Sequence, residues 1–154
     1  MSLAHAGHAG GGFPAIALIP AALADRGARS GGSGDDTPVD AAEFTPPDGA
    51  FLVAYLDGRP VGCGGWRSHG EDGDTAELKR MYTDPAARGR GVARAVLGAV
   101  ERSARDHGRK RIVLECGDKQ PEAIAMYTSS GYERIPNFGY YKDAPGCLSY
   151  GRTL

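Results

Sequence analysis

A short segment rich in glycine and arginine has the composition of a phosphate-binding turn. It reads Arg88-Gly89-Arg90-Gly91-Val92-Ala93 and lies between a strand-like run and a helical apolar pattern. Glycine lets a backbone approach a ligand closely and turn its N–H groups inward. The first N–H groups of a helix lack intrahelical partners, and the helix dipole adds positive potential there. Together with the two arginines, these features predict a pyrophosphate cradle; the alternative is an ordinary strand-to-helix loop with solvated arginines.

The same segment resembles a known cofactor signature. It matches neither a P-loop nor the full G-x-G-x-x-G dinucleotide fingerprint. Instead, Arg88-x-x-Gly91-x-Ala93 resembles the acetyl-CoA signature of the GNAT N-acetyltransferase family, Q/R-x-x-G-x-G/A. The run from Ala123 to Tyr132 (AIAMYTSSGY) is similar to that family's A-x-x-x-Y-x-x-x-G-F segment, and the two closing strand-like runs are a third similarity. The resemblance covers residues 50–154 well and the N-terminal third poorly.

This resemblance implies a binding site for acetyl-CoA as co-substrate. In the family, the strand before the turn splays away from the next parallel strand, and the pantetheine arm lies in the gap. The resemblance implies that Arg88–Ala93 hold the pyrophosphate and that Gln120, where many relatives carry Asn, contacts the cofactor. The backbone groups implied to hold the thioester carbonyl and the pantetheine amides belong to Met81, Tyr82 and Thr83.

The acceptor amine requires a general base, because an alkylammonium with a pKa near about 10.4 cannot attack until it loses a proton. The resemblance implies that Glu77, eleven residues before Arg88, is this base, acting directly or through a water. The alternative is a solvent-facing strand carboxylate paired with Lys79 or Arg80. Glu115, at the end of the next strand, is a second candidate.

Tyr127 matches the family's general acid, which protonates the departing CoA thiolate. The alternative for this residue is an aromatic side chain packed in the core with its hydroxyl satisfied. The sequence thus predicts transfer of the acetyl group to a primary amine of a small molecule or peptide by direct attack. Two alternatives remain: a non-catalytic CoA-binding regulatory module, and an acyltransferase that uses another acyl-CoA.

The elements that must position these residues follow an order of strands, helix, strand, helix and strands. Strand-like runs are separated by turn signals such as Asp57-Gly58 and by two helical patterns, the first closed by Gly108. This order predicts an α/β (α+β mixed) fold with a mostly antiparallel, partly splayed mixed sheet and flanking helices. Strands are expected at residues 50–57, 59–67, 75–83, 111–115, 132–141 and 147–154, and helices at 89–107 and 121–130.

The N-terminal third is the least informative part of the chain. Residues 1–12 (MSLAHAGHAGGG) predict a flexible tail, and residues 13–154 a single N-acetyltransferase domain. Within them we expect a buried strand from Ala15 to Ile19, a helix opened by Pro20, a loop over Ser30–Asp36 and a short helix from Thr37 to Phe44. The regions expected to shape the acceptor site are residues 30–49 and 139–146.

Composition excludes several classes of function. The chain has 154 residues and a formal net charge of −1, so charge gives no attraction to nucleic acid or to an anionic membrane. No apolar run reaches the about 18 residues that a membrane span needs. The three widely spaced cysteines predict neither a disulfide framework nor a metal site, and they fit a cytoplasmic protein. The expected partner is an amine acceptor, with a homodimer left open.

Overall fold

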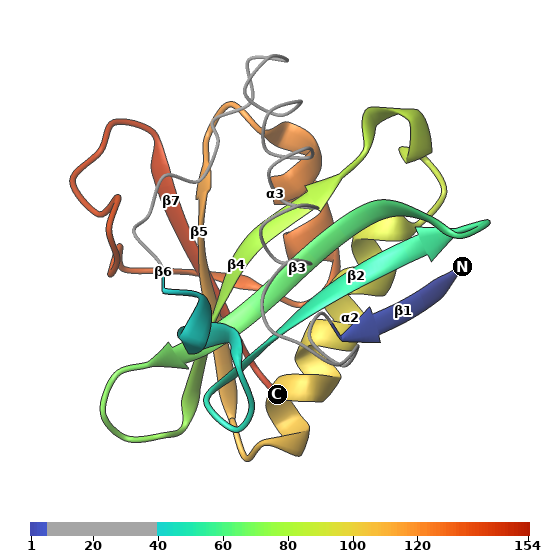
Figure 1. Ribbon diagram of the computed structural model, residues 1–154. Coiled ribbons are helices and arrows are strands. Elements are labelled where there is room, and N and C mark those ends of the chain that lie inside the picture. The colour runs from blue at the N-terminus through green and yellow to red at the C-terminus, as the bar shows by residue number, and fades with distance from the viewer. Residues whose placement is uncertain (6–39) are drawn as a thin grey trace.

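The computed structural model describes residues 1–5 and 40–154. Its strands form one mixed sheet in the order β1-β2-β3-β4-β5-β7-β6 (Figure 1). The strands are β1 (Ser2–His5), β2 (Gly49–Leu56), β3 (Arg59–His69), β4 (Thr75–Thr83), β5 (Arg111–Gly117), β6 (Glu133–Ile135) and β7 (Cys147–Thr153). The helices are α2 (Val92–Asp106) and α3 (Pro121–Ser129), with short 3₁₀ turns η1 (Ala41–Phe44) and η2 (Pro85–Ala87).

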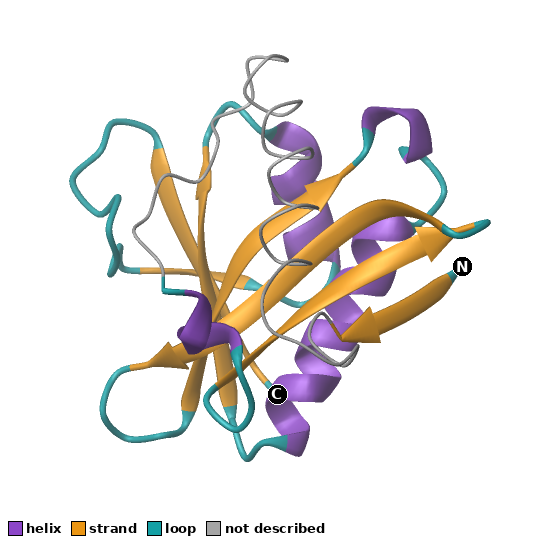
Figure 2. Ribbon diagram, viewed as in Figure 1, coloured by secondary structure: helices purple, strands orange, loops and turns teal. Residues whose placement is uncertain are grey.

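The sheet is antiparallel except at its centre, where β4 and β5 run parallel and are joined by the crossover helix α2. Helices α2 and α3 lie on the same face of this sheet (Figure 2). This arrangement confirms the predicted mixed, mostly antiparallel fold with flanking helices. No helix among the described residues is long and apolar enough to cross a membrane.

The main core lies between the sheet and α2. Val92, Val96, Val100 and Ala104 recur every four residues, which places them on one face of the helix, and all four are buried. Glycine on β3 lets this helix approach closely, because a Cβ at Gly62 would lie 2.6 Å from a Val92 methyl group. The helix that follows the candidate cradle is therefore anchored to the sheet along its length.

Strands β4 and β5 separate beyond the middle of the sheet. They pair only over Thr75–Glu77 and Arg111–Val113, although both strands continue. A bulge adds to the distortion, since β3 and β4 lose register between Cys63 and Gly65, and Arg80 adopts a positive φ of 58°. A bulge bends a strand and commonly redirects it next to an active site. The parting of β4 and β5 agrees with the splay that the resemblance implies.

Most elements predicted after residue 50 match the structure to within two residues at each end, and two differ by more. The first helix begins at Val92 rather than at residue 89, because Gly89 and Gly91 adopt positive φ values of 78° and 77° that a helix does not contain. The strand expected over 132–141 stops at Ile135, since Pro136 cannot donate to a sheet ladder.

The N-terminus differs from the predicted tail. Ser2–His5 pair with β2 as an edge strand, which needs backbone hydrogen bonds rather than large side chains. The strand, helix and loop expected between residues 15 and 36, and the start of the short helix at Thr37, lie outside the described residues. Among the described residues, Asp40 caps a 3₁₀ turn at Ala41–Phe44, which is the end of that predicted helix.

Candidate active site

The predicted cradle forms the connection from η2 to α2. Gly91 is the N-cap of α2 in the left-handed conformation, and no side chain caps the helix. A Cβ at Gly89 or Gly91 would meet no atom within 4 Å, so the outer surface of the turn is open. Arg88 and Arg90 are exposed on either side of Gly89. The turn therefore presents uncapped helix N–H groups and two guanidinium groups at one edge of the molecule.

The second part of the site is the portion of β4 that β5 does not pair. Met81, Tyr82 and Thr83 occupy this portion, directly after the bulge, and Tyr82 and Thr83 pair with β3 on the other side. Gln120 lies beyond the end of β5 as the N-cap of α3, without a side-chain capping bond. The predicted pantetheine-binding residues of β4 thus lie along its edge that β5 leaves unpaired, and Gln120 follows the end of β5, which remains paired with β7.

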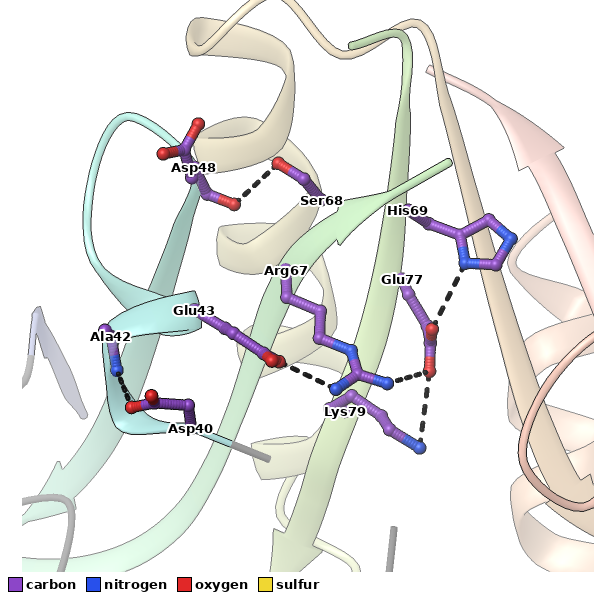
Figure 3. A network of polar contacts seen from close by, with 9 residues as sticks. All are labelled: Asp40, Ala42, Glu43, Asp48, Arg67, Ser68, His69, Glu77 and Lys79. Atoms are coloured by element: carbon purple, nitrogen blue, oxygen red, sulfur yellow. Dashed lines mark hydrogen bonds and ion pairs between the residues drawn. The ribbon is translucent and has the colours of Figure 1, made fainter. Parts of the chain in front are cut away.

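Glu77 is the last residue of β4 that pairs with β5, and it forms the centre of a charged cluster (Figure 3). Its side chain is only 5% exposed. One carboxylate oxygen lies 3.3 Å from Arg67 Nη2 and 3.3 Å from Lys79 Nζ, and the other lies 3.4 Å from His69 Nδ1. Arg67 also binds Glu43 at 2.7 Å, which joins η1 to the cluster. Helix α2 lies behind the sheet in this view, on the opposite face.

This arrangement corrects part of the sequence interpretation. Glu77 is not a solvent-facing carboxylate, although its predicted pairing with Lys79 is present. Arg67 and His69 were not predicted as its partners. The signal was available, because the turn between β3 and β4 fixes a register in which Arg67 lies opposite Glu77 and His69 opposite Thr75.

Tyr127 lies on α3 and is buried in the core of the helix-bearing face. Its ring packs edge-on against Tyr132 with ring centroids 5.6 Å apart. Burial, and to a smaller degree the nearby Cys116 thiol on β5, raise the pKa of the Tyr127 hydroxyl well above its usual range. The phenol therefore keeps its proton at neutral pH. Tyr127 packs against the helix-bearing face of the sheet, whereas the Glu77 side chain lies on the opposite face.

Glu115 lies on the separated part of β5 and holds the segment that follows β6. One carboxylate oxygen accepts a hydrogen bond from the Tyr141 backbone N–H at 3.0 Å and lies 3.5 Å from Cys147 Sγ. The other is buried against Gly139, where an added Cβ would displace the carboxylate. Glu115 is thus engaged in fixing the 139–146 segment beside the site.

The site as a whole combines an open, uncapped helix N-terminus with two arginines, a stretch of β4 that β5 does not pair, and a buried carboxylate with cationic neighbours. Within residues 1–5 and 40–154, no three His, Cys, Asp or Glu side chains are grouped as a metal would require.

Comparison with known proteins relates this geometry to a family. The model of the acetyltransferase (GNAT) family matches residues 22–132. The chain is 37% identical over 116 residues to the IAA acetyltransferase of Azospirillum brasilense, covering 75% of each chain. It is 38% identical over 93 residues to the N-acetyltransferase YjgM of Escherichia coli, where the match covers 60% of this chain and 56% of the relative.

Solved structures share the fold. A protein from Klebsiella pneumoniae described as an acyl-CoA N-acyltransferase superposes with a TM-score of 0.76 at 27% identity, covering 99% of this chain and 97% of that one. A GNAT family acetyltransferase from Elizabethkingia anophelis, solved with acetyl-CoA bound, has a TM-score of 0.70 at 15% identity and covers 99% and 97% of the two chains. The second likeness concerns the fold alone.

Proposed function

The chain belongs to the acetyltransferase (GNAT) family, and from this premise we propose that it transfers the acetyl group of acetyl-CoA to a primary amine of a small molecule or peptide. The observation that carries the proposal is the parting of β4 and β5 just beyond Glu77, directly before an uncapped helix N-terminus. An extended thioester requires such a gap, and its pyrophosphate requires such a helix end.

In this proposal the cradle binds the pyrophosphate of acetyl-CoA. The N–H groups at the start of α2 and the side chains of Arg88 and Arg90 supply the positive potential, and Gly89, Gly91, Val92 and Ala93 supply the backbone that approaches the ligand. Met81, Tyr82 and Thr83 offer backbone groups to the pantetheine arm and the thioester, and Gln120 offers an amide from the start of α3. A main-chain donor aimed at the developing oxyanion contributes about 2.7–4 kcal/mol to such a reaction.

Glu77 and Tyr127 carry the proton transfers in the proposed mechanism. Glu77 accepts a proton from the ammonium group of the acceptor, directly or through a water, and the free amine attacks the thioester carbonyl. The tetrahedral intermediate collapses with cleavage of the C–S bond. Tyr127 then donates its proton to the departing thiolate, and the surplus proton on the new amide nitrogen returns through water to the Tyr127 phenolate, so that one proton is released per acetyl group transferred. The raised pKa of Tyr127 keeps the phenol protonated at neutral pH but also makes it a weaker acid, so this role is supported by the place of Tyr127 in the Ala123–Tyr132 segment and not by its burial.

A free-CoA release assay across a panel of amines tests the function, with calorimetry for acetyl-CoA binding. We expect micromolar to millimolar binding of acetyl-CoA and amine-dependent release of CoA. Binding without turnover on any amine would instead favour a non-catalytic CoA-binding module. Turnover with a longer acyl-CoA but not with acetyl-CoA would identify a different acyl donor.

A further inference from the structure

This inference rests on the proposed acetyl transfer and concerns the fate of the proton that Glu77 accepts. The Glu77 side chain is 5% exposed, so bulk water has little direct access to it. Its two contacts at 3.3 Å, with Arg67 and Lys79, are with groups that carry a full complement of protons as cations. Neither can accept another. A buried base that turns over repeatedly needs a different route for its proton.

Among the described contacts of Glu77, His69 is the only side chain that can accept a proton at one atom and donate one from another. Its Nδ1 lies 3.4 Å from the second carboxylate oxygen, on the side away from Arg67 and Lys79 (Figure 3). The imidazole is 36% exposed, in contrast to the carboxylate that it touches. It therefore lies between a buried proton acceptor and solvent.

Phe138 holds the imidazole in this position. The two rings meet edge-on with centroids 4.9 Å apart, and Phe138 belongs to the segment after β6 rather than to the strands that carry Glu77 and His69. The charged groups facing His69 from the described elements are Glu77 and, beyond it, Lys79 on β4 and Arg67 on β3, with Glu43 of η1 bound to Arg67. Phe138 contributes no charge. Among the described residues, Glu77 is thus the single acidic group in direct contact with the ring.

We propose that His69 relays the proton from Glu77 to solvent. The ammonium N–H bond breaks as a proton passes to the Glu77 carboxylate. The resulting carboxylic acid gives this proton to Nδ1 of the neutral imidazole, and the imidazolium releases a proton from Nε2 to water. Exchange with water restores the starting tautomer. The carboxylate is regenerated, one proton leaves per acetyl group transferred, and no further reactant is needed.

The test compares His69→Ala and His69→Gln with the wild type in the CoA-release assay between pH 5 and 9, with and without added imidazole. His107→Gln is the matched control, since His107 is a part-buried histidine that packs on Trp66 and does not touch Glu77. We expect His69→Ala to lower kcat/KM about 100-fold near pH 7. Imidazole should restore activity in proportion to its concentration, and its own protonation should then govern the pH dependence.

The remaining outcomes separate the relay from other roles. We expect kcat/KM of the wild type to fall between pH 8 and pH 5. In His69→Gln, whose amide fills the place of the ring, the shape of this pH dependence should change. In His107→Gln it should remain that of the wild type. Wild-type kcat/KM in His69→Ala, or a uniform loss at every pH without imidazole rescue, would overturn the relay while leaving acetyl transfer intact. A wild type that releases no CoA with any amine would overturn acetyl transfer itself, and the relay with it.

Discussion

Glu77 lies within ion-pair distance of three basic side chains, which are Arg67, His69 and Lys79. A carboxylate taken out of water is costly unless its partners compensate for the lost hydration, and Arg67 and Lys79 do so from two neighbouring strands. The same contacts orient the carboxylate rigidly, which a proton acceptor requires. Lys79 is as buried as Glu77, so the stability of each depends on the other.

We predict that Glu77→Gln lowers both stability and turnover. Removing one partner of a buried ion pair leaves the other charge uncompensated, so the free energy of unfolding should fall by about 3–5 kcal/mol. The value of kcat should fall at least about 100-fold, because an amide cannot accept the proton. Urea unfolding and the CoA-release assay measure the two effects. Glu43→Gln, which removes a more exposed partner of Arg67, is the control and should cost no more than about 1 kcal/mol.

Tyr127 and Tyr132 form a pair of buried tyrosines that differ in their proposed roles. We predict that Tyr127→Phe lowers kcat about 100-fold with the Kd for acetyl-CoA nearly unchanged, since only the donated proton is lost. Tyr132→Phe removes a hydrogen bond of 3.1 Å to Glu101 and should lower stability by about 1 kcal/mol without affecting kcat. Steady-state kinetics and calorimetry make the comparison. An unaltered kcat in Tyr127→Phe, with chemistry rate-limiting, would remove Tyr127 from the mechanism.

At the scale of elements, α2 is flanked by two glycines that share one backbone conformation but lie at opposite ends of the helix, only one of them at the cradle. Gly91 begins the helix at the cradle with a φ of 77°, and Gly108 follows its other end with a φ of 80°. A methyl group added at either position would have no atom within 4 Å, so a substitution there meets backbone strain without steric conflict. Comparing substitutions at the two positions therefore distinguishes the effect of backbone strain from the effect of a contact with the ligand.

We predict that Gly91→Ala and Gly108→Ala each lower the free energy of unfolding by about 1–2 kcal/mol, the cost of a left-handed non-glycine residue. Only Gly91→Ala should weaken acetyl-CoA binding, about 10-fold or more, because its methyl group projects into the space proposed for the pyrophosphate. Calorimetry on both variants provides the measurement. Equal affinities would show that the cradle does not contact the ligand.

The elements predicted best from sequence are those whose pattern is local. The spacing of Val92, Val96 and Val100 identified α2, and the Asp57-Gly58 turn identified the hairpin of β2 and β3. The bulge at Arg80 was not predicted, although it explains why the apolar alternation of β4 is imperfect. A bulge depends on pairing with another strand, so it leaves only a weak local trace.

The candidate site shows the same division. The cradle could be predicted because glycine and arginine are contiguous in the chain, and its open N-cap is present as expected. The surroundings of Glu77 could be predicted only in part, since Lys79 is near in sequence whereas Arg67 and His69 come from the neighbouring strand. The contact of Phe138 with His69 joins residues far apart in sequence and carries no local signal.

At the scale of the whole molecule, burial leaves several thiol and phenol groups neutral in the folded chain. Burial raises the pKa of Cys63 from 9.0 to about 12 and that of Cys116 to about 11. The folded protein therefore retains protons that the unfolded chain loses above about pH 9. The contribution of these groups to the free energy of unfolding is fully present below that pH. It is lost as the pH rises toward the pKa values of the thiols in the folded protein.

We predict that the free energy of unfolding decreases with rising pH between about 9 and 12, and that Cys63→Val makes this decrease shallower by up to about 1.4 kcal/mol per pH unit. The variant has no thiol at this position to ionise when the chain unfolds. Urea unfolding at a series of pH values gives both slopes. The absolute stability of the variant does not matter to the comparison, and identical slopes would contradict the account.

The proposed binding of acetyl-CoA depends on the glycines of the turn, on the uncapped N-terminus of α2 and on the parting of β4 and β5. A crystal structure of the protein with acetyl-CoA tests this most directly. We predict the pyrophosphate within hydrogen-bonding distance of backbone N–H groups at residues 89–93, and the pantetheine arm between β4 and β5 with its thioester near Met81. Density for the pyrophosphate at any other surface, or a pantetheine arm outside that gap, would contradict the account.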